Sequence, residues 1–108
     1  MELDVGMQTF ELPGGTLQFN PTDPGLLARF EKLVDRIGDI EADDPVLFDT
    51  CAKQEINAAL GAGNDIHTAL NGVSLLAVGA NGKPVLLNLL EALAPILRKG
   101  AEQCAAAI

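Results

Sequence analysis

The sequence predicts an α+β fold, mostly α, with an N-terminal β-hairpin followed by three to four helices packed as a small bundle. Two observations support this prediction. A Pro-Gly-Gly turn at 13–15 joins residues 7–12 to residues 16–19, where Leu17 and Phe19 alternate with polar neighbours as in a strand with one buried face. The later segments repeat apolar residues at helical spacing, and two of them begin with an aspartate followed by a proline.

The chain has 108 residues, which fits a single domain. We divide it into a β-hairpin at 1–20, a helical body at 21–99 and a frayed, alanine-rich tail at 100–108. Apolar residues make up 48% of the chain, but it contains four Phe and neither Trp nor Tyr. We therefore expect a core built from Leu, Val, Ile and Ala.

The first helix is predicted to begin at Pro24. Asp23 can accept a free N–H of the first turn, and a proline at the first helical position leaves no donor unsatisfied. The turn Asn20-Pro21 precedes this start. An apolar stripe at helical spacing follows it, formed by Leu26, Leu27, Phe30, Leu33, Val34, Ile37 and Ile40.

The same start signal, Asp44 followed by Pro45, predicts a second helix that runs to about Leu60. Glycines at 61 and 63 end it, and Asn64-Asp65 can cap a short helix over 66–70 that Asn71-Gly72 closes. The apolar positions expected on the second helix are Leu47, Phe48, Cys51, Ala52, Ile56, Ala59 and Leu60.

Residues 73–78 are compatible with a short strand or with a buried helical turn, and we favour helical or irregular structure. Asn81-Gly82 signals a turn, which suits a hairpin equally well. A last long helix is predicted from Lys83 to about residue 103. Pro95 lies inside it and is expected to kink the helix or to end its first half.

The net charge of −8 disfavours binding to nucleic acid, because an acidic surface repels phosphate backbones. Glu2 and Asp4 interrupt any secretory signal, and no apolar run approaches the roughly 20 residues that cross a bilayer. We therefore expect a cytoplasmic protein that does not bind membranes. Cys51 and Cys104 are expected to be free thiols, with a disulfide as the alternative.

Chemical signatures are sparse, and we expect no catalytic residue, no metal and no cofactor. His67 is the one histidine and is interpreted as a solvent-facing helix residue. The carboxylates at Asp39, Glu41, Asp43 and Asp44 lack the spacing of a calcium loop and are interpreted as helix caps and solvated charge. The glycines at 61 and 63 lack the remainder of a phosphate-binding loop.

The apolar face of the last helix is wider than a narrow helix–helix seam requires. Such a face is either core or a surface for self-association or for a partner helix, and residues 73–78 share this ambiguity. We expect the protein to self-associate. The candidate partner-binding residues are Leu75, Leu76, Val78, Leu86, Leu89, Leu90 and Leu93.

The order of segments from Phe19 to about Leu97 resembles the small tail assembly chaperones of long-tailed bacteriophages and prophages. The segments that carry this resemblance are the turn into the first helix (Asn20, Pro21, Asp23 and Pro24), the turn with Gly61 and Gly63, and the final LLNLLEALAPIL. The resemblance implies a non-enzymatic protein of the bacterial host cytoplasm. It would coat the helical tape-measure protein and release it as tail tube proteins arrive, so these two are the implied partners.

Two other functions are compatible with the sequence. The net charge of −8 fits an acidic phage-encoded inhibitor that imitates nucleic acid and blocks a host defence or nucleic-acid-binding protein, although its carboxylates are spread along the whole chain. A small enzyme or ligand-binding domain is the third alternative, and no residue pattern selects a substrate for it.

Overall fold

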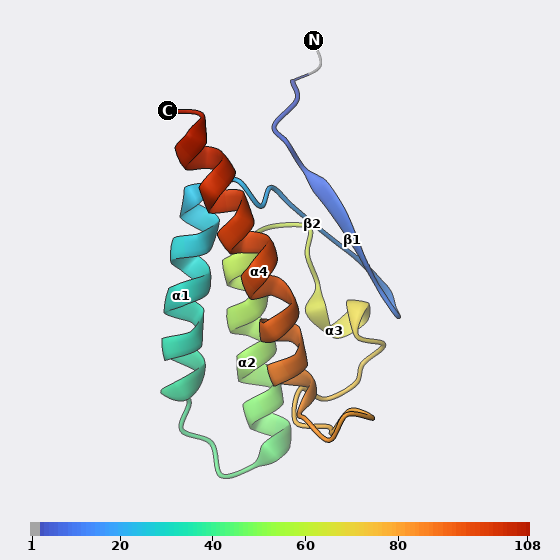
Figure 1. Cartoon of the computed structure of the whole chain (residues 1–108). Coiled ribbons are helices and arrows are strands. Elements are labelled where there is room, and N and C mark those ends of the chain that lie inside the picture. The colour runs from blue at the N-terminus through green and yellow to red at the C-terminus, as the bar shows by residue number, and fades with distance from the viewer. Residues whose placement is uncertain (1–2) are drawn as a thin grey trace.

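A two-stranded antiparallel sheet lies beside a bundle of helices in the computed structural model, which describes residues 3–108 (Figure 1). This arrangement confirms the predicted α+β fold. Met1 and Glu2, at the start of the predicted hairpin region, lie outside the described residues. The elements are β1 (Gln8–Leu12), β2 (Gly15–Phe19), α1 (Pro24–Gly38), α2 (Pro45–Leu60), α3 (Ile66–Ala69) and α4 (Val85–Ala106).

The hairpin turns over two residues, Pro13 and Gly14, because Leu12 already pairs with Gly15. Gly15 therefore belongs to β2, one residue earlier than the sequence indicates. The face of β2 that carries Leu17 and Phe19 is buried, as its alternation predicts. The rings of Phe10 and Phe19 stack with their centroids 4.5 Å apart, which joins the two strands on this face.

Three helices begin with the same aspartate cap. The carboxylate of Asp23 accepts the N–H of Gly25 at 2.9 Å, and Asp44 accepts that of Val46 at the same distance. Asp65 caps the short α3 in the same way. These caps confirm the predicted starts of α1, α2 and α3, because each satisfies a first-turn donor that no intrahelical carbonyl can reach.

The core is aliphatic, as the composition predicts, with Phe19 and Phe30 as its aromatic members. It is formed by residues of all four helices, the buried face of β2 and Leu75, and β2 contacts the helices mainly at α3. In the stripe predicted for the first helix, Leu26, Phe30, Leu33 and Ile37 are buried, and Leu27 and Ile40 are partly buried. Val34 is 46% exposed. Leu47 of α2 is also exposed, because it lies in the first turn of its helix at the end of the bundle.

Residues 73–78 are irregular, which confirms one of the two favoured interpretations and excludes a regular strand. A single antiparallel bridge joins Val78 to Pro84, and the N–H of Gly79 donates to the carbonyl of Lys83 at 2.8 Å. The turn between them uses Gly82 at a φ of +80°, a conformation that glycine adopts without steric cost.

Helix α4 is longer than predicted. It begins at Val85 instead of Lys83, continues through the exposed Pro95 and ends at Ala106, so Pro95 does not end its first half. The first residues of the predicted tail, up to Ala106, are therefore helical. Leu97 is fully buried, and Gly100 packs against the backbone of Pro21, so tertiary contacts hold α4 as far as Gly100. The residues of α4 after Gly100 are half-buried or exposed.

We predict that Gly100→Ala destabilises the protein by about 1–3 kcal/mol, because a Cβ there would overlap the carbonyl group of Pro21. Gly38 is the matched control, since it is also helical but has no atom within 4 Å of a Cβ. Gly38→Ala should stabilise the protein by up to about 1 kcal/mol through helix propensity. Urea denaturation measures both free energies of unfolding, and equal changes at the two positions would contradict the proposed contact.

Candidate functional site

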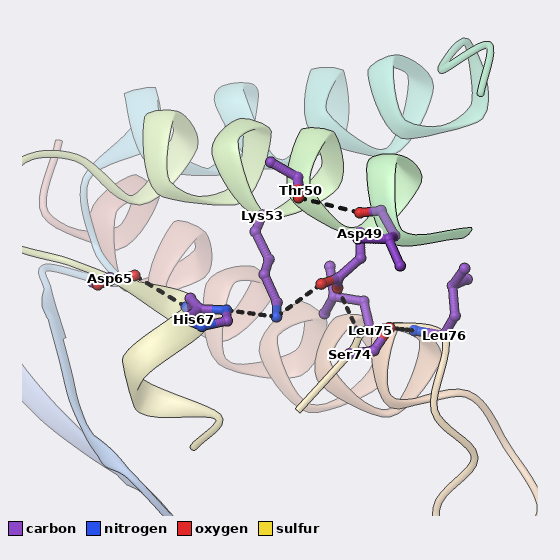
Figure 2. Close-up of polar contacts among 9 residues, drawn as sticks. Asp49, Thr50, Lys53, Asp65, His67, Ser74, Leu75 and Leu76 are labelled. Carbon is purple, nitrogen blue, oxygen red and sulfur yellow. Dashed lines mark hydrogen bonds and ion pairs between the residues drawn. The ribbon is translucent and has the colours of Figure 1, made fainter. Parts of the chain in front are cut away.

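Lys53 of α2 is the one charged side chain buried among the described residues, with 5% of its surface exposed. Its Nζ lies 3.0 Å from Oδ2 of Asp49, one helical turn earlier, and 2.8 Å from Nδ1 of His67 at the start of α3 (Figure 2). An ammonium group has only donors, so Nδ1 accepts and the proton of the neutral ring lies on Nε2. The three side chains form a chain of contacts across two helices.

The other carboxylate oxygen of Asp49 accepts the backbone N–H of Leu75 at 2.7 Å. One carboxylate therefore pairs the buried cation and also holds the irregular segment against α2. Asn57, two turns further along α2, accepts the N–H of Ile66 at 2.8 Å and anchors α3 similarly. We call Asp49, Lys53 and His67 the buried polar network.

A shallow cleft of about 420 Å³ opens above this network. The lining groups bind one another: Lys53 donates to Asp49 and His67, and the hydroxyl of Thr50 donates to the carbonyl of Val46 at 3.1 Å. Every buried side-chain nitrogen and oxygen in residues 3–108 has a hydrogen-bond partner. The arrangement thus serves to join α2, α3 and the segment after α3.

His67 is exposed, as the sequence predicts, but its ring also covers the buried ammonium of Lys53. The buried polar network was not predicted from the sequence. A local signal for it exists, because Asp49 and Lys53 stand four residues apart and so face one another on a helix. Burial of the pair depends on the segment around Leu75, which the sequence leaves ambiguous.

Asp65, the cap of α3, is held as a carboxylate by its neighbours. The hydroxyl of Thr68 donates to it at 2.8 Å, and the N–H of His67 donates at 3.1 Å. The Thr68 hydrogen bond is the main reason why the pKa of Asp65 lies below its ordinary value.

The seven predicted partner-binding residues divide into three groups. Leu75, Leu89 and Leu93 are buried in the core, and Leu86 and Leu90 are half-buried against it. Leu76 and Val78 are exposed, at 39% and 67%. The wide face of α4 is therefore mainly core, because α1 and the segment around Leu75 cover it.

Leu76 and Val78 lie among other exposed aliphatic side chains at one end of the molecule. The carbonyl of Leu75 accepts the N–H of Leu86 at 2.9 Å, while its N–H binds Asp49, so the irregular segment lies between the starts of α4 and α2. Figure 1 shows both helix starts and this segment at the same end. We call this surface the aliphatic end: Val46, Leu47, Val73, Leu76, Val78 and Leu87.

A second cleft, of about 180 Å³, lies between α1 and α2 and is lined by three of the seven cations of the chain, Arg29, Lys32 and Arg36. The Nε of Arg29 donates to the carbonyl of Ala59 at 3.0 Å, where α2 approaches its C-terminus. Arg36 is 3.5 Å from Glu55. These contacts join the two helices, and a cation near the negative end of α2 is favourable.

The acidic segment between α1 and α2 matches its predicted role in part. Asp44 caps α2, and Asp39 is the residue at which α1 ends. Glu41 and Asp43 are exposed. In residues 3–108, His, Cys, Asp and Glu nowhere gather in threes that could hold a metal ion.

Both cysteines are free thiols of intermediate exposure, which agrees with the predicted thiol state. Within the described part of the chain, no helix has the length and apolar character that crossing a membrane requires. No protein-family model, curated protein or solved structure matches the chain.

We predict that Asp49→Asn destabilises the protein by about 3 kcal/mol, because it leaves the buried ammonium of Lys53 without its counter-charge. The double variant Asp49→Asn with Lys53→Met should be more stable than Asp49→Asn alone, because it removes the unpaired cation too. Chemical denaturation of the single and double variants measures this coupling. Strict additivity of the two changes would contradict the ion pair.

The pKa of Asp65 should rise towards its ordinary value in Thr68→Ala, which removes the donating hydroxyl, and stay low in Thr68→Ser. A carboxyl whose pKa is lower in the folded than in the unfolded chain stabilises the fold above its unfolded pKa. This contribution is lost as the pH falls through the folded pKa. NMR titration of the Asp65 carboxyl carbon measures the shift, and an unchanged pKa in Thr68→Ala would show that this bond is not its cause.

Proposed function

We propose that this chain is a non-enzymatic tail assembly chaperone of a long-tailed phage or prophage. It covers apolar helical stripes of the tape-measure protein and helps to recruit tail tube subunits. The observation that supports this proposal is the aliphatic end, where side chains from α2, α4 and the segment between α3 and α4 are exposed at the same end of the molecule. The resemblance of residues 19–97 to tail assembly chaperones supplies the biological setting.

The chemistry of the aliphatic end suits a helical partner. An apolar stripe on a helix is satisfied by apolar contact alone, and its burial is favourable by about 25 cal/mol per Å² without any requirement for a particular polar partner. Val78, the most exposed residue of the irregular segment, projects from a bridge that Pro84 and Gly79 hold in place. The surface is therefore apolar but fixed in shape.

The binding surface in this proposal differs from the one that the sequence analysis places on the last helix. Leu89 and Leu93 hold α4 in the core, so a partner reaches only the residues around the start of α4. Leu76 and Val78 remain candidate contacts, joined by Val46 and Leu47 of α2. Leu75 supports them from inside the core.

Charge around the aliphatic end adds selectivity. Asp44 caps α2 directly before Val46 and Leu47, and the exposed Asp43 and Glu41 precede it. A partner helix with Lys or Arg beside its apolar stripe would be attracted to this border. The net charge of −8 would also keep a coated filament soluble by mutual repulsion.

Release of the tape-measure protein requires modest affinity for each chaperone copy, with many copies acting along one helix. A small aliphatic surface without buried charge pairs fits this requirement. Tail tube proteins would then displace the chaperones one at a time.

We predict that Val78→Asp abolishes the protection of the tape-measure protein encoded in the same phage or prophage genome, because the new carboxylate would have to be buried on binding. Val34→Asp is the matched control, since Val34 is a valine exposed at 46% on α1 and lies outside the aliphatic end. Each variant is co-expressed with the tape-measure protein, and the soluble fraction of the latter is measured by sedimentation.

Wild type and Val34→Asp should keep the tape-measure protein soluble, and Val78→Asp should not. Failure of the wild type to raise its solubility would overturn the proposed function. If Val78→Asp protects the tape-measure protein as well as the wild type does, the chaperone role stands but the aliphatic end is not its binding surface.

A further inference from the structure

The edge of β2 that faces away from β1 is occupied by the side chain of Asn64, which makes the hydrogen bonds that a neighbouring strand would make. The N–H of Gln18 donates to Oδ1 of Asn64 at 2.7 Å, and Nδ2 of Asn64 donates back to the carbonyl of Gln18 at 2.9 Å. Asn64 is itself buried, and its amide also donates to the carbonyl of Leu60 at 3.2 Å. The amide of Asn64 is therefore held rigidly in the position that a third strand would occupy.

These two bonds determine the direction of every backbone group in the hairpin. Because the N–H and C=O of Gln18 point away from β1, its pair with Thr9 is one that exchanges no hydrogen bonds. Because bonded and non-bonded pairs alternate, the hydrogen bonds of the hairpin fall at the pairs Gln8–Phe19, Phe10–Leu17 and Leu12–Gly15. The N–H and C=O groups of Thr9 and Glu11 consequently point away from β2, towards the open edge of the sheet.

Nothing in residues 3–108 covers that edge. Figure 1 shows β1 on the outside of the molecule, with β2 between it and the helices. The outward backbone groups of Thr9 and Glu11 enter none of the hydrogen bonds between elements of the described chain. Proteins usually protect such an edge with proline, with charged side chains, especially lysine, or with a bulge. Gln8–Leu12 contains no proline, lysine or bulge, and its one charged residue is Glu11.

We propose that β1 pairs, antiparallel, with β1 of a second copy of this chain, about a two-fold axis at Phe10. This register places Thr9 of each copy opposite Glu11 of the other, so all outward backbone groups of the strand are paired and no two carboxylates face one another. It also brings the two half-buried Phe10 side chains together, where each already stacks on Phe19 of its own chain. The result is a four-stranded sheet across the dimer.

The assembly closes at two copies. An edge strand that pairs with itself uses the same surface on both chains, and the remaining edges of the sheet are the two β2 edges that Asn64 occupies. Growth into a longer sheet would have to break those bonds. Each copy carries a net charge of −8, so added salt should tighten the dimer by screening the repulsion.

The test compares Thr9→Pro with Thr16→Pro by sedimentation velocity over a concentration series. Thr9 and Thr16 are both exposed, and both belong to pairs that exchange no hydrogen bonds, so each proline removes an outward N–H and leaves the hairpin bonds intact. Thr9 lies on the open edge and Thr16 on the β2 edge. We expect the wild type and Thr16→Pro to dimerise and Thr9→Pro to remain monomeric, with NMR contacts between Phe10 and Phe19 confirming that its hairpin is formed.

A second variant tests the same interface in case Thr9→Pro fails to fold. Thr9→Lys with Glu11→Lys retains every backbone amide but places lysines opposite one another across the proposed two-fold axis, and it should also lose the dimer. In a mixture of isotope-labelled and unlabelled wild-type protein, Hα–Hα contacts between the two copies should appear at Phe10.

A wild type that is monomeric at every concentration would overturn this proposal, as would a dimer that persists in both β1 variants or lacks contacts at Phe10. The proposal does not depend on the chaperone function. Val78→Asp should dimerise like the wild type, and loss of the dimer in that variant alone would place self-association at the aliphatic end instead of β1.

Discussion

The buried ammonium of Lys53 is the constraint on which the arrangement of this protein depends. A buried charge needs partners that compensate for its lost hydration, and here they come from separate elements. Asp49 supplies the counter-charge from α2, His67 supplies an acceptor from α3, and Asp49 also binds the amide of Leu75. Satisfying one cation therefore fixes the segment after α3 in place. That segment buries Leu75 and exposes Leu76 and Val78.

Polar side chains in this molecule repeatedly complete the backbone structure of a neighbouring element. Asn64 binds both backbone groups of Gln18, Asn57 binds the start of α3, and Arg29 binds a carbonyl near the end of α2. Such bonds are specific because a buried donor without an acceptor is costly. Two surfaces remain uncovered by residues 3–108. They are the aliphatic end and the open edge of β1.

Local signals in the sequence account for the starts of the first three helices and for the end of α2. An aspartate followed by proline sets the start of α1 and of α2, and Gly61 at a φ of +94° ends α2. These signals act over four residues or fewer, so they can be recognised in the sequence without knowledge of the fold. The candidate site is less predictable from the sequence. Leu76 and Val78 were predicted to belong to the binding surface and are exposed there. Leu89 and Leu93 were predicted to belong to it but are buried, and Val46 was not predicted.

The sequence by itself determined that a hairpin precedes a bundle of aliphatic helices, because turn residues, caps and apolar periodicity are properties of short segments. Only the tertiary structure decided which apolar residues are covered. Val34 and Leu89 both occupy predicted apolar stripes, yet α1 leaves the first exposed and the core encloses the second. The same holds for Lys53, which is buried, and for Gly100, which packs against the backbone of Pro21 where α4 enters the predicted tail. Burial depends on which elements meet, and that is a property of the packed chain as a whole.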